Sequence, residues 1–354
     1  MAARFYVPAY DGLRFVLLLG VLEYHYCLHR LPIERFWFLT YALCCFFVLS
    51  GFLITHLLLR SEAAGGPSGR KLMDFYIRRG LRVFPAYYVV LLVSACFLSV
   101  PYLGWQLTYL LNFKLFWLSL QPSAEFLGYM AGWRGNGVHL WSMAVEEQFY
   151  LLYPLLLWCS PRGWRGWLLG LGLALCIGCR LWLMRAFPDS CYGALTPVPG
   201  EYLLWGCWLA WLDFSERAGW LRGRVAFYGA FLVLLLLFGL DPDVQRYEYA
   251  QWRPPAHQTL YALALGLVVL GLRHHPRSWL TRALSWGPLV RLGKISYGTY
   301  LVHLFLSGPV ERLPLPPALG GPLLSLAVAG LMWVTFEERA NRAKDWLAPV
   351  ACEG

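Results

Sequence analysis

Two segments place ionisable side chains on one face of an otherwise apolar helix. In DGLRFVLLLGVLEYHY, Arg14 and His25 are eleven residues apart, so on a helix they lie within about 20° of one another and roughly 16 Å apart along the axis. In HLWSMAVEEQFYLLYPLLL, the residues His139, Ser142 and Glu146 also share one face. A histidine beside a buried carboxylate is suited to general-base catalysis, because the carboxylate fixes the tautomer and stabilises the imidazolium. We therefore predict that the two stripes meet across a helical bundle.

The same side chains also have a structural interpretation. A histidine inside a membrane can be a hydrogen-bonded packing residue, and Glu146 with Glu147 could pair with Arg180 or Arg185. Spacing alone leaves both interpretations open.

Arginines cluster in RKLMDFYIRRGLRVFPAYY, just before an apolar segment. Arg79 and Arg82 are an i, i+3 pair if a helix begins there, with Pro85 in its first turn, and paired guanidinium groups can bind phosphates in a bidentate manner. The alternative is that they mark the cytoplasmic side or bind lipid headgroups.

Ser50 and Gly51 interrupt the apolar run CCFFVLSGFLITHLLL near its middle. Small residues at such a position usually allow close helix packing. The alternative is that they leave room for a thin ligand chain beside the helix.

Composition places these segments in a membrane. Of the 354 residues, 58% are hydrophobic and only 14% charged, which is too apolar for a soluble core with a polar surface. The net charge of +10 is spread over short loops without a nucleic-acid-binding motif, so nucleic acid is not an expected partner. The CxxC pair Cys176 and Cys179 has no second ligand pair nearby, and we predict neither a metal site nor a structural disulfide.

Apolar segments predict an all-α, polytopic transmembrane bundle that occupies residues 1–354 as one membrane-embedded domain without a separate soluble domain. Alternate loops carry most of the 30 Lys and Arg residues, which predicts that both termini are cytoplasmic. The run Gln106–Leu120 is short and holds Asn112 and Lys114, so we predict a re-entrant or interfacial segment. The expected spans, about ten, are Leu13–Leu28, Phe36–Leu59, Val83–Leu103, Leu140–Cys159, Trp167–Arg185, Tyr202–Phe214, Val225–Leu240, Thr259–Leu272, Ile295–Val310 and Leu319–Phe336.

Five segments in this order resemble the acyltransferase 3 family of integral membrane acyltransferases. They are PAYDGLRFVLLLGVLEYH, FFVLSGFLIT, FYIRRGLRVFPAYY, HLWSMAVEEQFYLLYPLLL and KISYGTYLVHLFL. The resemblance covers about Tyr6 to Arg339. Two positions depart from the family pattern: Glu201 is the nearest charged group where members often carry an arginine, and the closing segment has Glu338 and Arg339 without the family's proline.

The resemblance implies transfer of an acyl group, most often acetyl from acetyl-CoA, to a hydroxyl of a carbohydrate, envelope polymer, lipid or secondary metabolite. It implies that His25 is catalytic with Arg14 and Glu146, and that Arg79, Arg82, Ser50 and Gly51 bind acyl-CoA. The further residues expected to contact substrate or to support the catalytic ones are His139, Trp141, Ser142, Glu147, Tyr300 and His303.

In this hypothesis His25, supported by Glu146 or Glu23, deprotonates the acceptor hydroxyl for attack on the thioester, with an acyl-histidine intermediate as the alternative. Acyl-CoA is a co-substrate, no tightly bound cofactor is expected, and the enzyme would lie among the lipids of the bacterial cytoplasmic membrane, with a homo-oligomer possible. A transporter or permease is the competing class, but no internal repeat is found. A non-catalytic scaffold or receptor would not require five ordered motifs.

Overall fold

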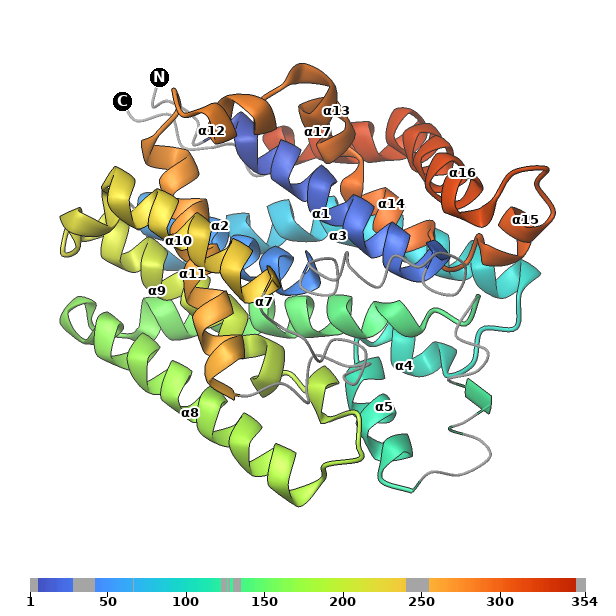
Figure 1. Ribbon diagram of the computed structural model, residues 1–354, viewed down its shortest axis with the longest axis horizontal. Helices are drawn as coiled ribbons and strands as arrows, with labels where there is room; N and C mark the ends of the chain where they lie inside the picture. The colour runs from blue at the N-terminus through green and yellow to red at the C-terminus, as the bar shows by residue number, and fades with distance from the viewer. Residues whose placement is uncertain are drawn as a thin grey trace.

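The computed structural model describes residues 6–27, 42–65, 67–121, 126, 128–129, 135–239 and 255–347, and these residues form helices and connecting turns without any strand (Figure 1). The predicted all-α class is confirmed. Residues 36–41 of the second expected span and residues 241–254 of an expected outer loop lie outside the described residues.

The helices follow the apolar segments of the sequence, with short helices at several of the connections. In chain order they are α1 (Pro8–Cys27), α2 (Ala42–Ala63), α3 (Ser68–Phe97), α4 (Leu103–Leu107), α5 (Leu111–Ser119), η2 (Val138–Leu140), α7 (Trp141–Cys159), η3 (Arg162–Trp164), α8 (Arg165–Ala186), η4 (Tyr192–Ala194), α9 (Pro197–Phe214), η5 (Gly219–Arg222), α10 (Arg224–Gly239), α11 (Pro255–His274), α12 (Trp279–Leu284), α13 (Gly287–Lys294), α14 (Ser296–Val302), α15 (Ser307–Glu311), α16 (Pro317–Met332), the π-helical turn η8 (Trp333–Glu337) and α17 (Glu338–Leu347).

Five helical segments in the described part of the chain are long and apolar enough to cross a membrane: Ala42–Ala63, Ser68–Phe97, Arg162–Ala186, Ala256–His274 and Pro317–Ala343. A shorter apolar helix covers Arg224–Leu237. Helix α1 has the length of a membrane span but contains Asp11, Arg14 and Glu23. These charged residues lower its mean hydropathy.

Two expected spans differ from the structure. The expected helix Ile295–Val310 is broken: α14 ends at Val302, residues 303–306 form turns, and α15 begins at Ser307. Helix α3 begins at Ser68, so the arginine-rich segment is already helical and Pro85 lies inside the helix. The prediction of Pro85 in the first turn was therefore wrong, because the first turn lies well before it.

The segment Gln106–Leu120 folds as α4 and the nine-residue α5, both too short to cross a bilayer. Its polar side chains are buried by partners: Asn112 donates to Thr196 Oγ1 at 3.0 Å and accepts from Gln148 Nε2 at 3.0 Å. These hydrogen bonds satisfy the Asn112 amide where α5 packs against α7.

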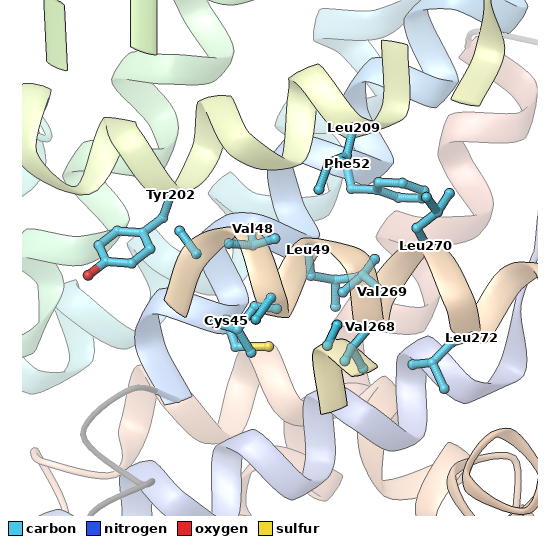
Figure 2. Packing of buried hydrophobic residues seen from close by; sticks show 14 of the residues in the cluster. Cys45, Val48, Leu49, Phe52, Tyr202, Leu209, Val268, Val269, Leu270 and Leu272 are labelled. Atoms are coloured by element: carbon cyan, nitrogen blue, oxygen red, sulfur yellow. The ribbon is translucent and has the colours of Figure 1, made fainter. Parts of the chain in front are cut away.

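Helices α2, α9 and α11 form the main apolar core (Figure 2). The contact between α2 and α9 depends on Gly51, since a Cβ there would lie 2.0 Å from the Leu203 carbonyl oxygen. Gly206 makes the reciprocal approach, with a hypothetical Cβ 2.0 Å from the Val48 carbonyl oxygen. The close-packing interpretation therefore applies to Gly51, and the space beside it is filled by α9 rather than left for a ligand chain.

Helix α1 is held by equally close backbone contacts. A Cβ at Gly293 of α13 would lie 2.0 Å from the Asp11 carbonyl oxygen, and one at Gly12 would lie 1.8 Å from the Leu284 carbonyl oxygen. In Figure 1, α1 crosses next to α13 and α14. These contacts fix the position of the helix that carries Arg14 and His25.

Candidate functional site

Arg14 and His25 lie on α1 at the spacing that the sequence predicts. Arg14 Nη1 contacts Asp11 Oδ1 at 2.8 Å, one turn earlier, and Asp11 Oδ2 also accepts a hydrogen bond from Tyr6 at 2.9 Å. About a fifth of the Arg14 side chain is exposed. The guanidinium is therefore oriented by its own helix and still accessible to a ligand.

A cluster of three histidines surrounds the other end of α1. His303 Nε2 lies 3.2 Å from His25 Nδ1, and the two rings are 4.9 Å apart between centroids. The His139 ring lies 4.7 Å from that of His303. Both His303 and His139 are buried. The structure thus joins the two stripes, but through His303 rather than by a direct pair of His25 and Glu146.

A hydroxyl pair continues this cluster. Ser142 Oγ and the Tyr300 hydroxyl lie 2.6 Å apart, and the Tyr300 hydroxyl donates to the His139 carbonyl oxygen at 2.9 Å. His139 Nε2 lies 3.2 Å from the Leu301 carbonyl oxygen, whereas its buried Nδ1 has no hydrogen-bond partner among the described residues. A buried nitrogen of this kind can accept a hydrogen bond from a substrate hydroxyl.

Glu146 has different partners from those we predicted. Its Oε1 accepts a hydrogen bond from Ser50 at 2.8 Å, and its Oε2 lies 3.8 Å from Arg79 Nη2. Arg79 also approaches Glu147 Oε1 at 3.5 Å, and its guanidinium lies 3.6 Å from the centre of the Tyr150 ring. These contacts compensate the burial of three charges on α3 and α7.

The structural alternative, a pairing of these carboxylates with an arginine, is realised by Arg79. Arg180 instead forms a buried pair with Glu201 at 2.8 Å, and both groups contact Thr259, at 3.1 Å and 2.6 Å respectively. Glu201, which stands where family members often have an arginine, is thus the partner of a buried arginine on α8.

Arg82 lies one turn beyond Arg79 on α3 and is exposed. It is within electrostatic range of Arg14 and Arg79, and of the buried carboxylate of Glu337 on the π-helical turn η8. Three guanidinium groups from two helices therefore lie among carboxylates, and Arg82 is the most exposed of the three.

Two further residues named in the sequence analysis are Trp141 and Glu23. Trp141 packs between the two largest apolar cores at the start of α7. Glu23 is exposed on α1.

Sequence reasoning missed three contributors: Tyr26, Tyr150 and Glu337. Tyr26 donates a short hydrogen bond to the His303 carbonyl oxygen, and Glu337 Oε1 is buried without a hydrogen-bond partner among the described residues. A carboxylate next to an apolar segment suggests a functional residue, so Glu337 could have been found from the sequence. The two tyrosines could not, because tyrosine is common at membrane interfaces whether or not it has a function.

A hollow of about 300 Å³ includes residues that come shortly before His139 in the sequence. It is lined by Leu98, Ser99, Pro101, Gly128, Tyr129, Gly135 and Asn136. The Asn136 backbone is held by Gln106, which donates to its carbonyl oxygen at 2.9 Å, and η2 with His139 follows directly. Within the described residues, no group of three or more His, Cys, Asp or Glu side chains is arranged to hold a metal ion.

Comparison with known proteins supports what this geometry indicates. The acyltransferase 3 model, described as an acyltransferase domain, matches residues 7–336. The chain belongs to the acyltransferase 3 family. The matched range includes every site residue described above except Tyr6 and Glu337.

Curated relatives of this acyltransferase 3 protein cover most of its length. Peptidoglycan O-acetyltransferase OatA of Listeria monocytogenes is 29% identical over 335 residues, which is 89% of this chain and 52% of the relative. A protein named "Putative peptidoglycan O-acetyltransferase YrhL" from Bacillus subtilis is 27% identical, over 88% of this chain and 50% of the relative. The chain thus spans about half the length of these relatives. No solved structure matches it.

Proposed function

We propose that the chain is a membrane-embedded O-acyltransferase that moves an acyl group, acetyl in the first instance, from cytoplasmic acyl-CoA to a hydroxyl of an envelope carbohydrate. The observation that carries the proposal is the placement of His25 beside the buried His303 and His139, with a partly exposed Arg14 on the same helix and an exposed Arg82 on α3. The family membership supports acyl transfer as the chemistry.

In this proposal the chain crosses the bacterial cytoplasmic membrane about ten times with both termini in the cytoplasm. The pair α14 and α15 counts as one interrupted crossing. Non-helical backbone at membrane depth is tolerated where it is buried in protein, and His303 at the interruption is buried.

Donor phosphates would bind at the cytoplasmic end of this bundle. Arg82 is exposed, whereas Arg14 and Arg79 each expose about a fifth of the side chain. Arg14 is paired with Asp11, and Arg79 with two carboxylates. We therefore assign direct phosphate contact to Arg82 and Arg14, and a supporting electrostatic role to Arg79. Ser50, hydrogen-bonded to Glu146, faces α7 on the path between this region and the histidines, whereas Gly51 packs against α9.

The reaction needs one proton acceptor and no external oxidant or reductant. His25 takes the proton of the acceptor hydroxyl while the oxygen attacks the thioester carbonyl carbon. The carbon–sulfur bond then breaks, and the imidazolium returns the proton to the CoA thiolate. A covalent acyl-histidine is the alternative route, and it would show ping-pong kinetics.

A carbohydrate acceptor is supported by two relatives, one named peptidoglycan O-acetyltransferase and one named "Putative peptidoglycan O-acetyltransferase". The hollow is lined by Tyr129, whose aromatic ring suits sugar stacking.

The test is transfer by the purified protein in lipid nanodiscs. Acetyl-CoA labelled in the acetyl group is supplied with soluble peptidoglycan fragments, and labelled ester is measured by mass spectrometry. Ester formed only when protein, donor and acceptor are all present supports the proposal. CoA release and ester formation both at the level of protein-free controls, with intact folded protein, would refute it.

A further inference from the structure

The contact between His25 and His303 also determines which ring nitrogens carry a proton. His303 Nδ1 lies 2.6 Å from the Tyr300 carbonyl oxygen, and His303 Nε2 lies 3.2 Å from His25 Nδ1. His25 Nδ1 in turn lies 2.9 Å from the Val21 carbonyl oxygen, one turn earlier on α1. Both histidines therefore have a ring nitrogen facing a group that can only accept a hydrogen bond.

Only one arrangement of protons on two neutral rings satisfies all three contacts. The carbonyl of Tyr300 requires a proton on His303 Nδ1, which leaves a lone pair on His303 Nε2. The carbonyl of Val21 requires a proton on His25 Nδ1, and that same proton can be shared with His303 Nε2. The opposite assignment would place a nitrogen lone pair against a carbonyl oxygen at both Val21 and Tyr300.

We infer that His303 is a positioning residue that presents His25 Nε2 to the acceptor hydroxyl as the base. It does so because His303 Nε2 and the Val21 carbonyl oxygen both accept a hydrogen bond from His25 Nδ1–H. When Nε2 takes the hydroxyl proton, the resulting imidazolium keeps both acceptors on Nδ1–H and is stabilised by them. No proton passes to His303. The catalytic part of this inference rests on the proposed function.

A neutral imidazole in this role suits the surroundings. The carboxylates predicted to support His25 were Glu146 and Glu23. The oxygens of Glu146 are occupied by Ser50 and Arg79, and Glu23 is exposed. A carboxylate placed against His25 would bring a negative charge into a region where His303 and His139 are almost fully buried, and its desolvation would be costly. A second imidazole supplies the hydrogen-bond acceptor without that charge.

The fold holds His303 in place from the helix that carries the base. Tyr26, next to His25 on α1, donates a hydrogen bond to the His303 carbonyl oxygen. The Tyr26 ring packs against Gly321 of α16, where a Cβ would lie 2.5 Å from the ring. Because α14 ends at Val302, the His303 carbonyl is not consumed by a continuing helix and is available to Tyr26.

The inference is tested with His303→Leu, which removes the acceptor, and His303→Gln, whose amide oxygen can restore it. His257→Gln on α11 is the matched control, because it makes the same change outside the cluster. We expect His303→Leu to lower kcat about 10- to 100-fold, with KM for acetyl-CoA and for the acceptor nearly unchanged. His303→Gln should recover a large part of that loss, and His257→Gln should match the wild type.

A second measurement does not depend on activity. Nitrogen-15 NMR of the wild-type protein with labelled histidine, assigned by comparison with His25→Gln, should show His25 protonated at Nδ1 and unprotonated at Nε2 near neutral pH. Protonation of His25 only at Nε2 would overturn the inference, as would wild-type kcat in folded His303→Leu or equal losses in the Leu and Gln variants. Absence of transfer by the wild type would instead overturn the proposed function, and with it the catalytic role of His303, while the NMR result would still decide the tautomer.

Discussion

At the scale of single residues, the chain compensates its buried charges by pairing them. Arg79 is placed between two carboxylates and over Tyr150, and Arg180 is paired with Glu201. Removing one member of such a pair leaves the other charge buried and uncompensated, which typically costs about 3–5 kcal/mol. His25 contacts two groups that can accept a hydrogen bond, the Val21 carbonyl oxygen at 2.9 Å and His303 Nε2 at 3.2 Å.

Replacing His25 by Ala should abolish most acyl transfer. A positioned general base typically contributes about 10²- to 10⁴-fold in rate, and we expect a loss of kcat in that range without loss of folded protein. The measurement is the rate of labelled ester formation in nanodiscs, with far-UV circular dichroism and gel filtration as checks of folding. Near-normal kcat in folded His25→Ala would remove this residue from the mechanism.

The double variant provides a sharper version of the same test. Residues that act as one unit are not additive, so adding His303→Leu to His25→Ala should cost no further activity. A full further loss on the double variant would show that His303 acts independently of His25.

Arg82 and Arg79 should respond differently to replacement by Ala. Arg82 is exposed and its loss removes a charge-assisted contact to a donor phosphate, worth about 1.5–3 kcal/mol, so KM for acetyl-CoA should rise roughly 10-fold or more. Arg79→Ala should chiefly lower the thermal unfolding temperature, because Glu146 and Glu147 lose their partner. Arg291→Ala, at another exposed arginine, is the control. An unchanged KM in Arg82→Ala would leave that arginine with a topological or lipid-binding role only.

At the scale of helices, much of the layout was predictable and the contacts between helices were not. Apolar length located α1, α2, α7 and α8 to within a few residues at nearly every described end, because each is limited by turn or charged sequence. The early start of α3 was missed because Arg70, Lys71, Asp74, Arg78 and Arg79 interrupt the apolar residues of this segment, so it was not counted as part of an apolar span. The pairing of Glu146 with Arg79 depends on how α3 and α7 are aligned, which spacing within one helix does not determine.

The α2–α9 contact offers a test at this scale. Gly51→Ala would bring a methyl group against the Leu203 carbonyl oxygen, and overpacking of this kind costs about 1–3 kcal/mol. We expect a lower unfolding temperature in detergent, with KM for acetyl-CoA unchanged in the protein that remains folded. Gly170→Ala on α8, where a Cβ meets nothing within 4 Å, is the matched control and should be neutral or slightly stabilising. Unchanged stability with a raised KM in Gly51→Ala would restore the hypothesis of a ligand chain passing beside Gly51.

At the scale of the whole molecule, basic residues gather where α2, α9 and α11 end together. Asp213 accepts from Arg222 and His274 at 2.8 Å each, and it also pairs with Arg273 and with the buried His56. Arg165 and Arg162 bind Glu62 at the end of α2. One end of the bundle thus combines many of the positive charges with the carboxylates that hold them, as the positive-inside rule expects of a cytoplasmic face.

This orientation makes opposite predictions for two exposed positions on either side of α14 and α15. Arg291 on α13 should face the cytoplasm, and Leu315, just before α16, should face outward. The sixteen residues from Ser296 to Glu311 would span roughly 24 Å as a helix, close to a bilayer core, so a single interrupted crossing can separate the two sites.

Cysteines introduced as Arg291→Cys and Leu315→Cys are treated with a membrane-impermeant maleimide on intact cells, with the unmodified chain as the background. Labelling of Leu315→Cys at once, and of Arg291→Cys only after permeabilisation, is the expected result. The reverse order would invert the bundle and place Arg82 and Arg14 on the side opposite to cytoplasmic acyl-CoA, and labelling of both from outside would mean that α14 and α15 do not cross.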